Sequence, residues 1–207
     1  EIKTMEKEIK NIIFDLGGII VNLDRQRCVD SFKAIGITDV ADYVDDSRQE
    51  DVFHELEIGA ISVTEFCDQV RLKSRCDATD EQICYAWNKM IKEIPEKRIK
   101  KLIDLHDSYH TYLLSNTNEI HWRYCYDKLF PYQDMGADNY FEDIFLSYEM
   151  HLIKPSEAIF TGVLEQAGIK AEETLFIDDS EVNCAAARRL GIKARCVKQS
   201  EDWTLLF

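Results

Sequence analysis

The chain has 207 residues and a formal charge of −14, from 25 lysines and arginines against 39 aspartates and glutamates. This length suits one domain with a sizeable insertion, and a hydrophobic fraction of 45% is typical of a globular protein with a buried core. The acidic balance argues against nucleic-acid and anionic-membrane partners, which require clustered basic residues. It does not exclude a small anionic substrate, because a local site can oppose the overall field.

The cysteines and the N-terminal segment bear on the compartment. Seven cysteines occur, an odd number, and no two have the CxxC spacing. This pattern argues against a zinc site or a disulfide framework and favours reduced thiols. The first eleven residues lack the apolar segment of a signal peptide, and no apolar run reaches the ~20 residues of a membrane span. We therefore expect a cytoplasmic protein with no membrane partner, and the oligomeric state stays open.

The first predicted element is a buried strand, Asn11–Phe14, which leads into Asp15. Residues 24–94 then show no strand signal, and four stretches have the helical periodicity of about 3.6 residues. They are residues 29–35, 49–56, 63–73 and 80–91. The sequence therefore predicts a helical subdomain, residues 23–94, inserted into an α/β core formed by residues 1–22 and 95–207.

The rest of the chain alternates helices and strands. A predicted helix at 95–110 precedes a strand at 111–114, and helices at 156–167 and 181–190 flank a strand at 174–177. Continuous apolar strands between helices indicate a parallel sheet with helices on both faces. Such sheets bind ligands beyond the carboxyl ends of their strands, so residues that follow the strands are expected to meet in one site.

Polar residues follow all three predicted strands. Two adjacent carboxylates, Asp178 and Asp179, come after the third strand, where they repel each other unless a cation compensates. Mg²⁺ is the natural partner, since it prefers carboxylate oxygens. The first strand leads into Asp15, and two glycines close behind it permit a tight turn near a ligand.

The remaining candidates each have a simple structural alternative. Ser115 and Asn116 follow the second strand, where a hydroxyl and an amide often only cap the chain. Lys154 stands before Pro155 at the start of a predicted helix, where a lysine is commonly solvated. The case for a site is the combination of these residues at one sheet edge.

The order Asp15, Ser115, Lys154 and Asp178-Asp179 is similar to the motif order of the haloacid dehalogenase (HAD) superfamily. The matching stretches are residues 13–24 (IFDLGGIIVNLD), 113–118 (LLSNTN), 154–160 (KPSEAIF) and 176–191 (FIDDSEVNCAAARRLG). Together with residues 53–62 (FHELEIGAIS), they resemble cap-bearing sugar-phosphate phosphatases, the subgroup that includes bacterial α-glucose-1-phosphate phosphatase. The resemblance implies a Rossmann-like parallel sheet with an α-helical cap and a Mg²⁺-dependent phosphatase.

The resemblance also implies a role for each residue of the set. Asp15 would attack phosphorus to form an aspartyl-phosphate. Mg²⁺ would be held by Asp15, the Gly17 carbonyl and Asp179, with Asp178 as a secondary contributor. The phosphoryl group would be bound by Ser115, the Asn116 N–H and the turn at Gly17 and Gly18, and Lys154 would neutralise the charge that Asp15 shares with the phosphate.

Gly17 departs from the family pattern, because most HAD phosphatases carry a second aspartate there as general acid and base. The substrate would then have a better leaving group, such as an anomeric phosphate, or its own hydroxyls would help the leaving oxygen depart. Alternatively, another residue of the protein would act as the acid. Asp24 is a candidate acid, and the alternative is that it caps the first cap helix. His54 and Glu57 flank the turn at residues 57–60 and are candidates for substrate contact; otherwise they form an ordinary helix end.

The leading hypothesis is a Mg²⁺-dependent phosphatase of a small phosphate ester, most plausibly a sugar phosphate. A 2-haloacid dehalogenase is the first alternative, because those relatives also lack the second aspartate and attack carbon instead. A HAD protein that binds a phosphorylated ligand with weak catalysis is the second. A two-component receiver domain is excluded, since its acidic pair comes first in the sequence and the pair here comes last.

Overall fold

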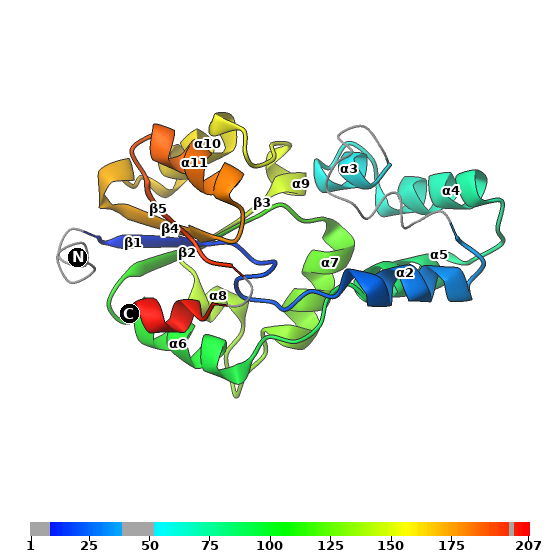
Figure 1. Ribbon diagram of the computed structural model, residues 1–207, viewed down its shortest axis with the longest axis horizontal. Helices are drawn as coiled ribbons and strands as arrows, with labels where there is room; N and C mark the ends of the chain where they lie inside the picture. Colours follow the sequence, from blue (N-terminus) through cyan, green and yellow to red (C-terminus); the bar gives the residue numbers. More distant parts are fainter. Residues whose placement is uncertain (1–8, 39–51, 199–200) are drawn as a thin grey trace.

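The computed structural model describes residues 9–38, 52–198 and 201–207 (Figure 1). Its centre is a five-stranded sheet in the order β3-β2-β1-β4-β5, with every pair of neighbours parallel. The strands are β1 (Asn11–Phe14), β2 (His110–Ser115), β3 (Asp143–Leu146), β4 (Thr174–Asp178) and β5 (Lys193–Cys196). Because the strands are parallel, their carboxyl ends share one edge, as the predicted α/β fold requires.

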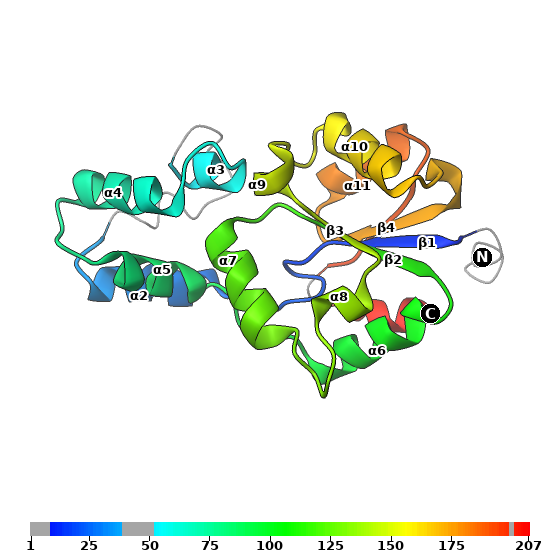
Figure 2. The same ribbon diagram turned by 180° about the vertical axis from the view of Figure 1, so that it is seen from behind.

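Helices cover both faces of the sheet (Figures 1 and 2). Helices α10 (Glu157–Ala167) and α11 (Glu181–Arg189) lie on one face, and α6 (Glu96–His106), α8 (Ala137–Tyr140) and η4 (Trp203–Leu206) on the other. Side chains of β1 alternate between these layers: Ile13 packs into the α10–α11 cluster, whereas Ile12 and Phe14 pack on the α6 side. This alternation explains why the central strands read as continuous apolar runs.

A helical cap stands apart from the sheet (Figure 1). It contains α2 (Arg25–Ala34), α3 (Val52–Glu57), α4 (Val63–Ser74) and α5 (Asp80–Asn88). These helices bury an apolar cluster of their own, which includes Phe32, Phe53, Phe66 and Trp87. A cluster separate from that of the sheet means that the cap is stabilised largely by its own packing.

The two chain crossings between core and cap lie side by side. Leu23 and Ile91 form an antiparallel bridge, and Asn22 N donates to Glu93 O at 3.0 Å. Buried Arg98, in α6, donates from Nη1 to Ile20 O and to Asn22 Oδ1, both at 3.0 Å. The cap is thus attached through a paired linker that is anchored to the core.

Several elements differ from the sequence predictions. Strands β3 and β5 were not predicted, and neither were α7 (Glu119–Tyr124), η2 (Cys125–Leu129), α9 (Ser147–Met150) and η3 (Ala171–Glu173). The helix predicted at 95–110 ends at His106, and the one predicted at 80–91 ends at Asn88. The first part of the helix predicted at 49–56 falls outside the described residues.

All seven cysteines are described, and none of them forms a disulfide. Within the described ranges, no helix has both the length and the apolar character needed to cross a bilayer.

Candidate active site

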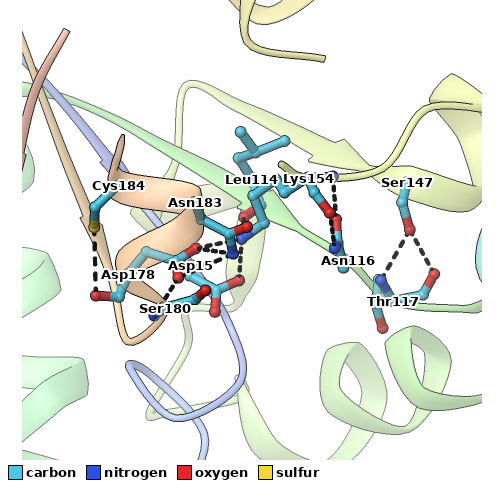
Figure 3. A network of polar contacts seen from close by, with 10 residues as sticks. All are labelled: Asp15, Leu114, Asn116, Thr117, Ser147, Lys154, Asp178, Ser180, Asn183 and Cys184. Atoms are coloured by element: carbon cyan, nitrogen blue, oxygen red, sulfur yellow. Dashed lines mark hydrogen bonds and ion pairs between the residues drawn. The ribbon is translucent and has the colours of Figure 1, made fainter. Parts of the chain in front are cut away.

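Three carboxylates and a lysine meet at the carboxyl edge of the sheet. Figure 3 shows two of these carboxylates, Asp15 and Asp178, with Lys154. Asp15 follows β1, Asp178 ends β4, and Asp179 is the next residue. Each of the three offers a carboxylate oxygen within 4.8 Å of the others. Lys154 enters from the segment between α9 and α10. The structure therefore brings together residues up to 164 positions apart, as expected from their places after parallel strands.

The Lys154 ammonium is fully buried, with 1% of its side chain exposed. Nζ donates to Asp15 Oδ1 at 2.7 Å, to Asp178 Oδ2 at 2.7 Å and to Leu114 O at 3.1 Å. These three acceptors use all three of its donors. Burial by itself would lower the pKa of Lys154, but the two carboxylates outweigh burial and raise it. Lys154 is therefore a fixed positive charge, held between two aspartates.

Asp15 lies beside two other carboxylates, Asp178 and Asp179, and one ammonium, Lys154. Burial raises the pKa of Asp15 to about 7; Lys154 opposes this rise, and Asp178 and Asp179 add to it. One ammonium among three carboxylates leaves a net negative cluster, which a divalent cation would neutralise. Three clustered carboxylates form the hard oxygen donor set that suits Mg²⁺, so these residues fit the predicted metal.

Asp178 and Asp179 differ in their partners. Asp178 Oδ1 accepts from Ser180 N at 2.8 Å, and Asn183 Nδ2 lies 3.1 Å from both Asp178 oxygens. With Lys154 also bound, protein donors occupy both oxygens of Asp178, and its secondary role at the metal stays a prediction. Asp179 packs against the turn after β1: a Cβ on Gly18 would lie 2.3 Å from Asp179 Oδ2. Gly18 also has a φ of +80°, so this close approach requires glycine.

Ser115 ends β2 beside this cluster and is buried, and Asn116 follows it. The Asn116 side chain forms a reciprocal pair with the Lys154 backbone. Asn116 Nδ2 donates to Lys154 O, and Lys154 N donates to Asn116 Oδ1, both at 2.9 Å. Sequence reasoning assigned only the backbone N–H of Asn116 and missed this clamp, which fixes the segment that carries the lysine.

The space at Gly17 is occupied by the cap linker. A Cβ at this position would lie 3.0 Å from Leu23 Cδ1. Asp24, the candidate replacement acid, is the N-cap of α2 and accepts from Arg27 N at 3.2 Å. Capping is the structural alternative that the sequence had offered for it, and its function as an acid stays a prediction.

The cap turn touches the core close to the phosphate-binding candidates. His54 and Glu57 both lie in α3, the helix that leads into this turn. Ser147 Oγ is 2.7 Å from Glu57 O, and Thr117 N donates to Ser147 Oγ at 2.9 Å. Sequence reasoning did not identify Ser147, because no local pattern marks a residue whose partners lie 30 and 90 positions away.

Comparison with known proteins agrees with this geometry. The sequence profile of the haloacid dehalogenase-like hydrolases matches residues 9–191. A D-ribitol-5-phosphate phosphatase from Bacteroides thetaiotaomicron is 32% identical over 195 residues, which are 94% of this chain and 95% of that protein. The crystal structure of a HAD family enzyme from the same organism, in complex with magnesium and inorganic phosphate, is 43% identical. It covers 96% of this chain and 99% of its own, with a TM-score of 0.93.

More distant structures share only the fold. An L-2-haloacid dehalogenase from Xanthobacter autotrophicus is 14% identical, with a TM-score of 0.58, and covers 90% of this chain and 76% of its own. The profile match, by contrast, spans both the first strand, which leads into Asp15, and the acidic pair at the end of β4. The chain therefore belongs to the family of haloacid dehalogenase-like hydrolases.

Proposed function

We propose that this protein is a Mg²⁺-dependent phosphatase that hydrolyses a small phosphate ester, either a sugar phosphate or the phosphate of a related polyol. The observation that carries the proposal is the buried Lys154 ammonium between Asp15 and Asp178, with Asp179 completing a carboxylate cluster. The relative named for D-ribitol-5-phosphate and the similar enzyme bound to magnesium and phosphate support it.

The metal ligands that we propose are Asp15, Asp179 and the Gly17 carbonyl, with Asp178 in a secondary, orienting role. When bound, Mg²⁺ supplies positive charge that lets a phosphate approach the carboxylates. Lys154 opposes the rise that burial causes in the pKa of Asp15 and holds this side chain in place through their 2.7 Å ion pair.

The phosphoryl group would be held at the ends of β1 and β2. The Ser115 hydroxyl, the Asn116 N–H and the turn at Gly17 and Gly18 are the proposed contacts. Phosphoryl transfer depends mainly on positioning and on charge stabilisation, so this small set suffices.

The reaction would proceed in two displacements at phosphorus. A carboxylate oxygen of Asp15 forms a bond to phosphorus as the bond to the ester oxygen breaks, and the departing alkoxide takes up a proton. A water molecule then attacks phosphorus, gives up a proton and displaces the Asp15 carboxylate, which releases inorganic phosphate. Asp15 is thereby regenerated.

The source of the first proton is the open chemical question at Gly17. Ribitol-5-phosphate, the substrate in the relative's name, is an acyclic polyol phosphate with no anomeric carbon. An acyclic polyol phosphate is therefore a candidate substrate beside an anomeric phosphate. We propose that a substrate hydroxyl or water protonates the leaving oxygen, with Asp24 as the protein alternative.

The cap, which we place at residues 23–94, would close over the substrate and exclude water during the first displacement. His54 and Glu57 lie at the end of the cap that meets the core, so we propose that they face the part of the substrate beyond the phosphate. The core would comprise residues 1–22 and 95–207.

The test is phosphate release from a panel that includes ribitol-5-phosphate, glucose-1-phosphate and p-nitrophenyl phosphate. We expect turnover with Mg²⁺, none in EDTA, and none in Asp15→Asn. Turnover that survives EDTA or Asp15→Asn would contradict the proposal. Halide release from a 2-haloacid would favour the dehalogenase, and ligand-induced stabilisation without turnover would favour a binding protein.

A further inference from the structure

Ser147 connects the phosphate-binding side of the core with the cap. It begins α9, directly after β3, and Leu146 is in register with Ser115 of β2. Its side chain is buried. Thr117, two residues after Ser115, donates its N–H to Ser147 Oγ at 2.9 Å (Figure 3). The hydroxyl therefore lies against the loop that carries the phosphate-binding candidates.

The same hydroxyl has two carbonyl acceptors within reach. Ser147 Oγ is 2.7 Å from Glu57 O in the cap and 2.9 Å from Thr117 O in the core. A serine hydroxyl has one proton, so it donates to one of these carbonyls at a time. Glu57 is the last residue of α3, where a carbonyl has no intrahelical N–H to accept from. Bonding to Glu57 thus satisfies a helix end, and Thr117 O is the alternative acceptor of the same proton.

Two further contacts seat the cap turn on the same segment. His151 Nδ1 donates to Ile58 O at 2.9 Å. Gly59 has a φ of +65°, and a Cβ there would lie 2.0 Å from Tyr148 O. Three consecutive turn residues, 57–59, therefore rest on residues 147–151, and α3 lies beside α9 in both ribbon views.

We propose that Ser147 is a positioning residue that couples the cap turn to the phosphate-binding loop. Its hydroxyl fixes Thr117 through the accepted N–H and holds the turn of α3 through the donated proton. Substrate-facing cap residues are thereby kept at a set distance from the phosphate. The assignment rests on the proposed phosphatase function and concerns substrates long enough to reach the cap.

The first experiment compares Ser147→Ala with wild type on two substrates. For ribitol-5-phosphate or the best polyol or sugar phosphate of the panel, we expect kcat/KM to fall about five- to tenfold, as for loss of a hydrogen bond. The fall should lie mainly in KM. For p-nitrophenyl phosphate, which carries no polyol chain, we expect a clearly smaller fall, about two- to threefold, from the lost Thr117 contact alone. Thr161→Ala is the matched control, because it removes a hydroxyl that bonds Glu157 O on the exposed side of α10.

A second readout does not depend on turnover. Hydrogen–deuterium exchange of the segment 53–62 should accelerate in Ser147→Ala, while that of β1 and β4 stays at wild-type rates. The assignment would be overturned if Ser147→Ala had the exchange rates and the kinetics of wild type on both substrates. An equal loss of kcat/KM on both substrates would also overturn it. If wild type hydrolyses no phosphate ester, the proposed function fails, whereas the exchange result still decides whether Ser147 holds the turn.

Gly59→Ala keeps the proposal testable if Ser147→Ala does not fold. The added methyl group would lie 2.0 Å from Tyr148 O, and the variant retains the Ser147 hydroxyl. We expect the same substrate-dependent loss and the same accelerated exchange. If both single variants fold, the double variant should lose less than the product of the two single losses, because both substitutions act on one contact. Independent, fully multiplicative losses would contradict the coupling.

Discussion

Replacing Lys154 with alanine would leave two buried carboxylates without their shared counter-charge. The Lys154 ammonium pairs with Asp15 and with Asp178 at 2.7 Å each, and its side chain is 1% exposed. Breaking a buried ion pair by removing one partner costs about 3–5 kcal/mol. Asp178 keeps its bonds from Ser180 and Asn183, so the loss should stay near one such pair and not double.

The assay is urea unfolding of the metal-free protein in EDTA at pH 7. We expect the free energy of unfolding of Lys154→Ala to fall by about 3–5 kcal/mol relative to wild type. Lys154→Met retains an apolar stem of similar length beside the Phe176 ring, and thus separates lost charge from lost packing. Lys100→Ala is the surface control, since the Lys100 side chain is exposed and pairs with exposed Glu96 one helical turn away, and the unfolding midpoint of this variant should not move.

Activity adds a second measure of the same residue. Phosphate release should fall about a hundredfold or more in Lys154→Ala, because a preorganised charge at the reacting group is lost. Mg²⁺ should restore part of the stability, since it compensates the same carboxylates. A Lys154→Ala protein that unfolds at the wild-type midpoint in EDTA would refute the reasoning, because the ammonium would then not be offsetting buried charge.

Three further outcomes follow from the structure. Gly18→Ala should raise the Mg²⁺ concentration for half-maximal activity about tenfold by displacing Asp179, whereas Gly168→Ala, also at positive φ but with open space around it, should leave it unchanged. Mg²⁺ at a hundredfold excess over its Kd should raise the free energy of unfolding by about 2.7 kcal/mol, and a Tm equal in EDTA and in Mg²⁺ would contradict a metal site. Burial lowers the pKa of His121 to about 4. The unfolded chain therefore takes up a proton before the folded one, and about 3 kcal/mol of stability should be lost as pH falls from 6.5 to 4, with a shallower loss in His121→Phe.

The parts of the site that follow strands were predictable from sequence. Buried parallel strands are apolar throughout and stop at polar residues. Asp15 and the Asp178-Asp179 pair therefore indicate in the sequence where β1 and β4 end. The geometry of parallel sheets then required these ends to meet. Lys154 was found through the motif order, because a lysine before a proline carries no local sign that its side chain will be buried.

The edge strands and the supporting contacts were not predictable in this way. Strand β5 consists of Lys-Ala-Arg-Cys, and half-exposed basic residues at a sheet edge give no apolar signal. The Asn116 clamp on the Lys154 backbone spans 38 positions, and the Ser147 contact with the cap spans 90. Side chains that bond to distant backbone groups leave no periodicity, so only tertiary structure reveals them.

The paired linker at Leu23 and Ile91 has a consequence for how the chain folds. β1 must find β2 across nearly half the sequence, because Phe14 and His110 are separated by the whole cap. Once the cap helices have packed, however, the two linkers meet, and the chain between the strands is shortened to a small fraction of its contour. The entropic free-energy cost of bringing β1 and β2 together should fall by about 1 kcal/mol. An insertion whose two ends touch therefore holds the flanking strands close together. Replacing the inserted cap with a short hairpin should leave the assembly of the sheet nearly as fast.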